Sequence, residues 1–455
     1  MARCPGWSGT TAPTPMQTPR GKSETPSVLL WAFTLQIETL SLKLIGMDRA
    51  WSTLLNTYLT RFPCVAILGV RQCGKTTLLR GLPKPWKIFD LDRRADAEVV
   101  GRDPDTFFRL NPRHVALDEI QNTPGVFQAL RVAIDERRSE RGRFVLTGSS
   151  SPTLLRSVSE SLAGRIGIIE MAPLTWAEVT GKPGGDSFLG RLTDRRLGPA
   201  ALIEGLELRG DIAAAHAYWF QGGYPEPWLV PDPAFRSDWA EQYLQTYLQR
   251  DVKALFPGLD DIRFRRFVEM LGGLSGRVLN YSEVARALGV SQPTARDYLD
   301  IAHGTFVWRT IPAYIRDTVK RVVKHPRGYL RDSGLLHRLL RIPDREALLS
   351  HPQMGASWEG MVTEEILRQL GAQGVSNEVA YYRTGAGAEV DLVLTADFGC
   401  VGFEIKHASS VGARDLRALR EFVDGQKARL GVVIHNDTAP RLYEDRIVGV
   451  PFTHV

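Results

Sequence analysis

The sequence predicts an α/β protein built from several domains, and three patterns along the chain indicate this fold class. Short apolar runs alternate with helical patterns over residues 47–180, which predicts a parallel sheet covered by helices on both faces. Residues 181–260 are patterned mainly as helices, and strand patterns return after about residue 346. Because 455 residues are too many for one ordinary hydrophobic core, we expect these segments to form separate domains.

The boundaries that we predict follow changes in composition and periodicity. Residues 1–46 are rich in Ser, Thr, Pro and Gly and lack periodicity, so we expect them to be disordered, or not to be translated if synthesis starts at Met47. The remaining segments are a sheet domain at 47–180, a helical lid at 181–260, a helix-turn-helix or winged-helix module at 261–345 and a second α/β domain at 346–455.

The composition describes a globular protein with a mild basic excess. The formal net charge is +6 and the pI is about 9.1, so the distribution of charge says more about a polyanionic partner than its total. Cys4, Cys64, Cys73 and Cys400 show neither C-x-x-C pairing nor neighbouring His ligands, which argues against disulfides or zinc and favours a reducing cytoplasm. No apolar run reaches the roughly 18 to 20 residues that span a bilayer, so we expect no membrane anchor.

The stretch GVRQCGKT has the pattern of a phosphate-binding loop. It follows the apolar run CVAIL and precedes the helical run TLLRGL, the strand, loop and helix context that G-x-x-x-x-G-K-[ST] requires. Backbone N–H groups of such a loop converge on phosphate oxygens at a helix N-terminus, Lys75 reaches the β and γ phosphates, and Thr76 places its hydroxyl on Mg²⁺. The predicted nucleotide-binding residues are Gly69, Gln72, Gly74, Lys75, Thr76, Thr77 and Asp118. The alternative is a glycine-rich turn that matches by chance.

Two buried strands downstream supply the residues expected to act on the nucleotide. HVALDEIQ ends in Asp118, which can hold Mg²⁺ through its water shell, and Glu119, which can orient or deprotonate the attacking water. RFVLTGSSS offers Thr147 or Ser149 to contact the γ phosphate or position the water; the alternative is that these residues only begin a loop or cap a helix. Arg165 is placed to stabilise charge in cis or across a subunit boundary, or it is a surface arginine.

These motifs together resemble a known family. The motifs that carry the resemblance are GVRQCGKTTLL, ALDEIQ, VLTGSSS, SLAGR and APLTWAEV, followed by GGYPEP and YLQRDV. The chain resembles the predicted AAA-type ATPases of bacteria and archaea that carry a C-terminal restriction-endonuclease-like domain of the PD-(D/E)xK type. The resemblance covers nearly everything from Met47 onward and implies Mg-ATP as the ligand. GTP is disfavoured because nothing like an N-K-x-D motif is present.

YSEVARALGVSQPTARDYLDIA predicts two helices joined by a turn. Ser282 would cap the first helix, Gly289 would make the turn and Ser291 would cap the second. In a DNA reader the residues facing base edges would be Gln292, Thr294, Ala295 and Arg296. The following stretch, 312–341, holds eight basic and two acidic residues and would suit phosphate contacts, so we expect DNA contact through residues 282–341. The alternative is a module used only for packing.

The family resemblance implies a nuclease-like core at the C-terminus, where AEVDLVL and CVGFEIK flank the turn TADFG. If the turn centres between Asp397 and Phe398, Asp391 faces Glu404 and Glu389 faces Lys406. Two facing carboxylates repel unless a cation lies between them, so Asp391 and Glu404 predict a divalent metal site. Lys406 would support the attacking water, and Glu359 would supply a further carboxylate. The alternative is an ion pair between Glu389 and Lys406, with Glu364 or Glu365 facing the site in place of Glu359.

Two functions follow from these patterns. The first is an ATP-binding and ATP-hydrolysing protein whose nucleotide state moves the winged-helix module and a nuclease-like domain, on or near DNA. The second is a non-catalytic ATP-dependent switch that assembles with itself or with other proteins, using a degenerate nuclease fold for docking.

Overall fold

The computed structural model describes the chain from residue 49 onward, in segments. They are 49–149, 160–184, 186–230, 232–247, 252–256, 258–314, 325–385 and 387–455. The predicted disordered or untranslated segment 1–46 lies outside them. So do four residues of the basic stretch, Arg316, Lys320, Arg321 and Lys324.

In the described part of the chain, five strands form the parallel sheet that the alternating apolar runs predicted. They are β1 (Cys64–Gly69), β2 (Lys87–Asp90), β3 (Val115–Asp118), β4 (Phe144–Ser149) and β5 (Ile166–Glu170), in the spatial order β2-β3-β4-β1-β5. All neighbours run parallel, so the carboxyl ends of the strands meet at one edge of the sheet. At that edge β4 separates β1, which leads into GVRQCGKT, from β3, which ends at Asp118.

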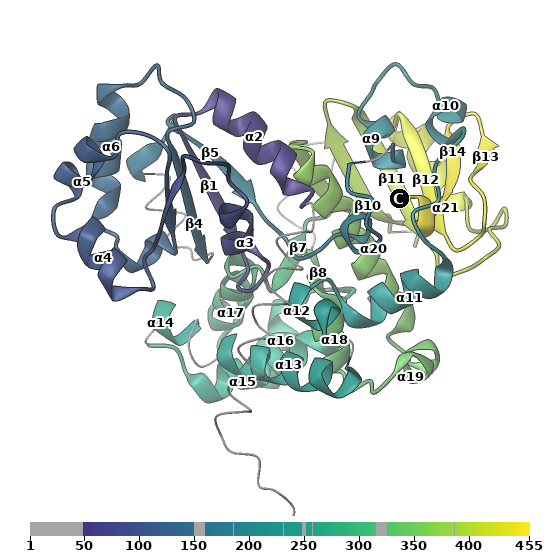
Figure 1. Cartoon of the computed structure of the whole chain (residues 1–455). Coiled ribbons are helices and arrows are strands. Elements are labelled where there is room, and N and C mark those ends of the chain that lie inside the picture. The colour runs from purple at the N-terminus through teal and green to yellow at the C-terminus, as the bar shows by residue number, and fades with distance from the viewer. Residues whose placement is uncertain are drawn as a thin grey trace, which may run out of the picture. The chain divides into compact units, whose positions relative to one another are not determined.

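Helices cover both faces of this sheet, as expected (Figure 1). Val65 and Ile67 of β1 pack with α2 (Trp51–Arg61) and α3 (Lys75–Arg80), whereas the alternate residues of β1 share a core with the helices on the other face. Those helices are α4 (Arg94–Gly101), α5 (Pro104–Leu110) and α6 (Val126–Glu136), and a single turn, η1 (Ile120–Asn122), follows β3. The central strands β1, β3 and β4 are buried almost throughout, which explains their apolar runs, whereas the edge strands β2 and β5 have exposed residues.

The segment predicted as a helical lid is helical but divides its contacts between two cores. Its helices are α8 (Trp176–Val179), α9 (Phe188–Leu192), α10 (Pro199–Ile203), α11 (Ile212–Gln221), α12 (Pro225–Leu229), α13 (Pro233–Thr246) and α14 (Lys253–Leu255). Tyr243 of α13 shares a core with β1 and α3, whereas Phe188 and Trp219 pack with the C-terminal sheet. The expectation of a lid over the first sheet is therefore wrong for α9 and α11.

The next segment combines helices with a small sheet. Its elements are α15 (Asp261–Leu274), β6 (Arg277–Val278), α16 (Tyr281–Leu288), α17 (Gln292–Gly304), β7 (Trp308–Ile311), β8 (Arg327–Leu330), α18 (Ser333–Leu339) and α19 (Arg345–Ser350). The strands are antiparallel, in the order β6-β8-β7. Ser291 caps α17 as predicted, but Asn280, not Ser282, caps α16, because its side chain accepts from the N–H groups of Ser282 and Glu283.

The C-terminal sheet is mixed and lies between two helices. Its elements are α20 (Met354–Ala372), β9 (Asn377–Arg383), β10 (Glu389–Ala396), β11 (Gly399–Ile405), α21 (Arg417–Gln426), β12 (Leu430–His435), β13 (Arg441–Glu444), β14 (Ile447–Pro451) and the turn η4 (Phe452–His454). The strand order is β13-β14-β12-β11-β10-β9. Leu392 and Phe403 pack with α20 on one face, and Val393 and Val433 pack with α21 on the other.

The predicted register of the β10–β11 hairpin is confirmed. Leu392 pairs with Phe403, and the pairing continues to Ala396 opposite Gly399. The same register, continued by one pair, sets Asp391 opposite Glu404.

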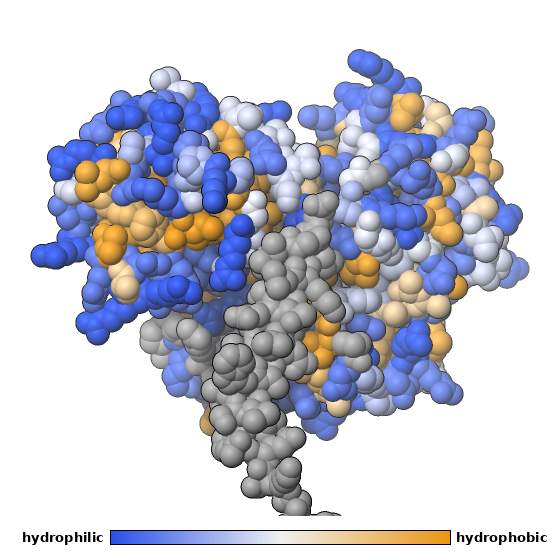
Figure 2. Space-filling model, in the orientation of Figure 1, coloured by the Kyte–Doolittle hydropathy of each residue, from blue (hydrophilic) through white to orange (hydrophobic). Residues whose placement is uncertain are grey.

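The surface is mostly hydrophilic on the face shown in Figure 2, with apolar residues in separate patches. Among the described residues, no helix is long and apolar enough to cross a membrane.

Candidate functional site

The phosphate-loop candidate has a backbone shape that only small or strained residues adopt. Gln72 and Gly74 both have positive φ, 58° and 99°, which turns successive N–H groups of the loop toward a common point. A Cβ on Gly69 would lie 2.1 Å from the carbonyl oxygen of Met171, and a Cβ on Gly74 would lie 2.6 Å from Arg49 Nη1. Both glycines are therefore required by close approach of neighbouring groups.

Lys75 opens α3 and folds back onto the loop. Its Nζ donates to the carbonyl oxygens of Gly69 at 3.1 Å and Val70 at 2.8 Å, and the side chain is buried. Thr76 and Thr77 follow in the first turn of the same helix and are half-buried. An ammonium group held only by carbonyl dipoles can exchange them for phosphate oxygens, which carry a full charge.

Asp118 lies at the carboxyl end of β3, next to the loop. It is 2% exposed, and the Thr147 hydroxyl on β4 donates to its Oδ1. Burial raises the pKa of Asp118, while hydrogen bonds from the hydroxyls of Thr147 and Thr76 act in the opposite direction. The structure thus brings Thr76 and Asp118, the two predicted magnesium residues, to one place.

Glu119 has a strained backbone and a fixed side chain. Its φ of 54° and ψ of 51° are left-handed, a conformation that non-glycine residues adopt mainly where the surroundings enforce it. Glu119 Oε2 accepts from Gln121 Nε2 at 2.5 Å and from both the N–H and the hydroxyl of Ser149 at 3.3 Å. Burial opposes its ionisation, but the nearby Lys75 charge and these donors hold the pKa of Glu119 below its ordinary value. Thr147 and Ser149 therefore contact the two acids directly.

Arg49 is a residue of this site that the sequence reasoning missed. Its guanidinium donates to the carbonyl oxygens of Cys73 at 2.6 Å and Ala172 at 3.0 Å, and Nε pairs with Glu178 Oε1 at 2.7 Å. Arg49 is 5% exposed. It ties the phosphate loop to the segment after β5, and no motif marks it because its partners lie far away along the chain.

The structure does not bring Arg165 to the phosphate loop within the same chain. Arg165 precedes β5, and Ile166 pairs with Cys64 at the start of β1, so Arg165 lies at the opposite end of the sheet from Gly69. Its guanidinium makes a bidentate pair with Asp135 of α6, with N–O distances of 2.7 and 2.8 Å. The cis role is therefore wrong, and a role across a subunit boundary stays a prediction.

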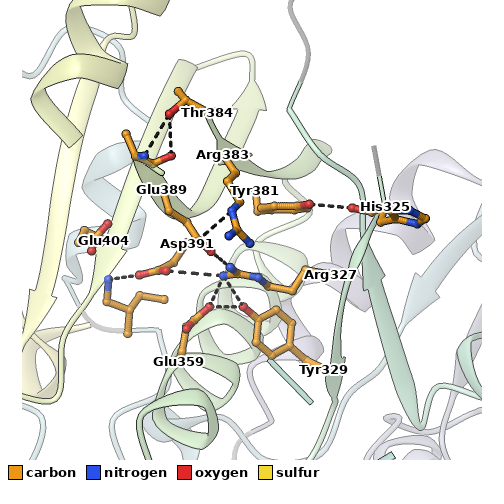
Figure 3. Close-up of polar contacts among 12 residues, drawn as sticks. His325, Arg327, Tyr329, Glu359, Tyr381, Arg383, Thr384, Glu389, Asp391 and Glu404 are labelled. Atoms are coloured by element: carbon orange, nitrogen blue, oxygen red, sulfur yellow. Dashed lines mark hydrogen bonds and ion pairs between the residues drawn. The ribbon is translucent and has the colours of Figure 1, made fainter. Parts of the chain in front are cut away.

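The C-terminal candidates Asp391, Glu404 and Glu359 do come together (Figure 3). Asp391 Oδ2 accepts from the backbone N–H of Ile405 at 2.8 Å. Glu404 is 6% exposed; its Oε1 pairs with Lys406 Nζ at 2.6 Å, and its Oε2 is buried without a hydrogen-bond partner among the described residues. These residues come from β10, β11 and α20.

The cation between these carboxylates is Arg327 of β8, a residue that sequence reasoning assigned to DNA phosphates. Arg327 Nη1 lies 2.6 Å from Glu359 Oε1 and 3.7 Å from Asp391 Oδ1, and Nη2 pairs with Glu389. Tyr329 donates its hydroxyl to Glu359, and the guanidinium stacks over the Tyr381 ring. Figure 3 shows the guanidinium in the middle of this group.

The residues present do not fit a metal ion in this arrangement. Among the described residues, no group of three or more His, Cys, Asp or Glu side chains is disposed to hold one. Burial and the Asp391 charge raise the pKa of Glu404 to about 8 and that of Glu359 to about 7, although Lys406 and Arg327 respectively oppose the shifts. The predicted divalent site of Glu359, Asp391 and Glu404 is therefore corrected: a guanidinium takes the place of the cation.

The alternatives weighed from sequence at this site are also wrong. Glu389 pairs with Arg327 and Arg383, and Lys406 pairs with Glu404, so the Glu389–Lys406 ion pair is not formed. Glu364 and Glu365 point elsewhere. Glu364 pairs with Arg309 and Arg331, while Glu365 accepts from the Trp176 N–H and the Tyr218 hydroxyl.

The predicted DNA-reading residues are only partly accessible. Gln292 and Arg296 are exposed, Thr294 is half-buried, and Ala295 is fully buried, so Ala295 cannot face a base. In the basic stretch, Arg327 and Arg331 are turned inward to carboxylates, and Arg338 pairs with Glu241 at 2.8 Å. The expectation of a basic surface is therefore wrong for these three arginines.

Comparison with protein families divides the chain into three matched segments. Residues 61–180 match an AAA domain, residues 212–346 match a domain of unknown function (DUF8612), and residues 354–455 match a second domain of unknown function (DUF4143). The AAA match covers the parallel sheet and its phosphate loop.

Two solved structures are similar to 65% of this chain. The Walker-type ATPase PABY2304 of Pyrococcus abyssi is matched over 96% of its own length, with 18% sequence identity and a TM-score of 0.39. The Aeropyrum pernix ORC1 protein, solved in complex with DNA, is matched over 92% of its own length, with 13% identity and a TM-score of 0.29. The uncharacterized proteins Rv2008c of Mycobacterium tuberculosis and Mb2031c of Mycobacterium bovis are each 36% identical over 396 residues, covering 86% of this chain and 81% of each relative. The chain therefore belongs to the family of these two mycobacterial proteins and contains an AAA-type P-loop ATPase domain.

Proposed function

We propose that this protein hydrolyses Mg-ATP at the phosphate loop and transmits its nucleotide state to the C-terminal domain. The observation that carries the proposal is the meeting of Lys75, Asp118 and Glu119 at one edge of the parallel sheet. The loop, the aspartate and the glutamate come from three different segments, and each has a role in ATP hydrolysis that its position allows.

The roles of the chain's own groups follow from their contacts. Loop N–H groups and the start of α3 bind the phosphates, and Lys75 exchanges the carbonyls of Gly69 and Val70 for phosphate oxygens. Glu119 stays ionised and is held by Ser149, so it can orient a water molecule and accept its proton. Thr76 and Asp118 offer oxygen ligands that suit Mg²⁺, which when bound neutralises charge on the transferred phosphoryl group.

Two substitutions test this proposal. Lys75→Ala should abolish ATP binding, whereas Glu119→Gln should retain binding and lose steady turnover, because glutamine fits the site but cannot accept the proton. Binding is measured by titration with a fluorescent ATP analogue and turnover by phosphate release. Tight binding without turnover in the unsubstituted protein would favour the non-catalytic switch.

An ion network that is buried at Glu364 and exposed at Glu170 supports transmission from the first domain to the last. Arg331 follows β8; its Nη2 lies 2.7 Å from Glu170 Oε1 at the end of β5 and its Nε 3.2 Å from Glu364 Oε2 of α20. Glu170 is followed by Met171 and Ala172, whose carbonyls contact the phosphate loop through Cys73 and Arg49. A shift of the loop can therefore reach α20, which also carries Glu359.

We propose that the C-terminal domain is nuclease-like in fold. While Arg327 pairs with its carboxylates, the role of this domain is docking and not cleavage. The support is Arg327, which neutralises carboxylates that a nuclease would use to bind a metal ion. We propose that α17, where Gln292 and Arg296 are exposed, makes the contact with DNA. Charge reversal of Arg296 should then weaken binding of duplex DNA and reduce its salt dependence, measured by fluorescence anisotropy.

A further inference from the structure

We propose that Arg327 is a removable counter-ion that keeps a divalent cation out of the carboxylate cluster of Glu359, Asp391 and Glu404. This inference does not depend on ATP hydrolysis. The residue types of this cluster suit a metal ion, but the group that they hold is the guanidinium of Arg327.

The contacts show that Arg327 neutralises Glu359 and Asp391, while Glu404 pairs with Lys406. It reaches Glu359, Asp391 and Glu389 from one position, and it is 5% exposed, so its charge is little screened by water. Buried carboxylates this close require a positive partner or a bound proton, because two ions of like charge are strongly destabilising where water is excluded. A guanidinium on β8 and a divalent cation would therefore exclude each other.

Glu404 indicates that the cluster is not complete with Arg327 alone. Its Oε2 atom is buried and lacks a hydrogen-bond partner among the described residues, although Lys406 holds Oε1. A buried carboxylate oxygen without a donor is unusual, since leaving it unsatisfied destabilises the fold. The hairpin register sets Glu404 opposite Asp391, so a small cation could bind both carboxylates once the guanidinium has left.

The origin of Arg327 makes its departure feasible. The carboxylates belong to α20, β10 and β11, whereas Arg327 belongs to β8, a four-residue strand of a different sheet. Arg331, just beyond the other end of β8, is held by Glu170 and Glu364. Because Glu364 belongs to α20, a displacement of β8 that withdraws Arg327 must also break the pair between Arg331 and Glu364, but it need not unfold the C-terminal sheet.

The test is Mn²⁺ binding to the full chain without nucleotide, followed by electron paramagnetic resonance of free Mn²⁺. Arg327→Met keeps much of the side-chain volume and removes the charge. We expect Arg327→Met to bind Mn²⁺ at least about tenfold more tightly than the unsubstituted protein, and the gain to vanish in the double variant with Asp391→Asn. Arg331→Met is the matched control, because it removes a largely buried, doubly paired arginine just beyond the other end of β8 and should bring no such gain.

A second variant keeps the proposal falsifiable if Arg327→Met is unstable. Glu389→Gln removes one partner of Arg327 but none of the three proposed ligands, so it should give a smaller gain in Mn²⁺ affinity and a melting temperature that rises with Mn²⁺. The proposal is overturned if neither variant binds Mn²⁺ more tightly than the unsubstituted protein, or if the gain survives Asp391→Asn. It is also overturned if the unsubstituted protein already binds Mn²⁺ in an Asp391-dependent manner, because Arg327 would then not exclude the cation.

Discussion

Buried arginines organise both candidate sites at the level of single residues. Arg49 donates to two carbonyl oxygens and a carboxylate beside the phosphate loop, and Arg327 reaches three carboxylates beside β10. A planar guanidinium can serve several acceptors at fixed angles, whereas an ammonium is a single point charge on a flexible stem. Both sites therefore depend on the planar geometry of the guanidinium group as well as on its charge.

Arg49→Lys should accordingly weaken the phosphate loop while preserving the charge. We expect the free energy of unfolding to fall by about 1–3 kcal/mol, because at least one of the Cys73, Ala172 and Glu178 acceptors loses its donor. ATP binding should weaken as well, since the loop is then less well held. Urea unfolding and ATP titration measure the two effects. Arg61→Lys, at the exposed end of α2, is the control, and equal behaviour of the two variants would contradict the prediction.

The residues of the candidate phosphate site could be placed at one edge of the sheet from sequence, because each lies in a short contiguous motif. Lys75, Asp118 and Glu119 are identified by a loop pattern or by a strand end, and neither requires knowledge of distant partners. Arg49 and Arg327 could not be predicted, because their meaning comes from acceptors far along the chain. A basic residue in a charged stretch is ordinarily exposed to solvent. The basic stretch around Arg327 therefore predicted an exposed side chain, whereas Arg327 is buried.

At the level of elements, α20 places three glutamates in three environments. Glu359 faces Arg327, Glu364 faces Arg309 and Arg331, and Glu365 accepts from neutral donors. Burial opposes ionisation of Glu364, but its two arginines lower the pKa to about 2. Burial raises the pKa of Glu365, despite the hydrogen bonds that it accepts.

Neutralising these neighbouring glutamates should therefore have unequal effects. Glu364→Gln leaves Arg309 and Arg331 without their carboxylate and should destabilise the protein by roughly 3–5 kcal/mol, the usual consequence of breaking a buried ion pair. Glu365→Gln should cost much less, because the amide oxygen can still accept from the Trp176 N–H, while the amide NH₂ can donate to the Tyr218 hydroxyl, which then donates to the Leu174 carbonyl. The midpoints of urea unfolding compare the two. A larger loss for Glu365→Gln would show that the network around Glu364 is not the stabilising one.

The elements themselves were largely predictable from sequence. All five strands of the first sheet and the register of the β10–β11 hairpin follow from apolar periodicity and from one turn position. The helices α16 and α17 follow from their turn, although the cap of α16 is Asn280. Strands β13 and β14 were not predicted, because β13 has no strong apolar alternation and is stabilised by pairing with β14.

For the whole molecule, His337 joins elements from three predicted domains. Its Nδ1 lies 3.0 Å from the Phe220 carbonyl oxygen at α11, which requires a proton on Nδ1. In the neutral imidazole, Nε2 accepts from the Ser357 hydroxyl on α20 at 2.7 Å, while Ser357 itself accepts from Trp219 Nε1 at 2.9 Å. The neutral imidazole therefore satisfies every contact of this network. Sequence could not show this, since a lone histidine in α18 carries no motif.

This network predicts a loss of stability in mild acid. Burial lowers the pKa of His337 to about 4 from an ordinary value of 6.5, so the unfolded chain binds a proton between these pH values while the folded chain does not. Stability is then complete above about pH 6.5 and falls as the pH drops toward 4, by about 2 kcal/mol at pH 5 from this residue alone. His337→Asn keeps a donor for Phe220 and cannot gain the proton, so it should be less stable at pH 8 but lose less on acidification. Urea unfolding of both proteins at pH 8 and pH 5 measures the difference; parallel losses would mean that other groups, such as His435, carry the acid sensitivity.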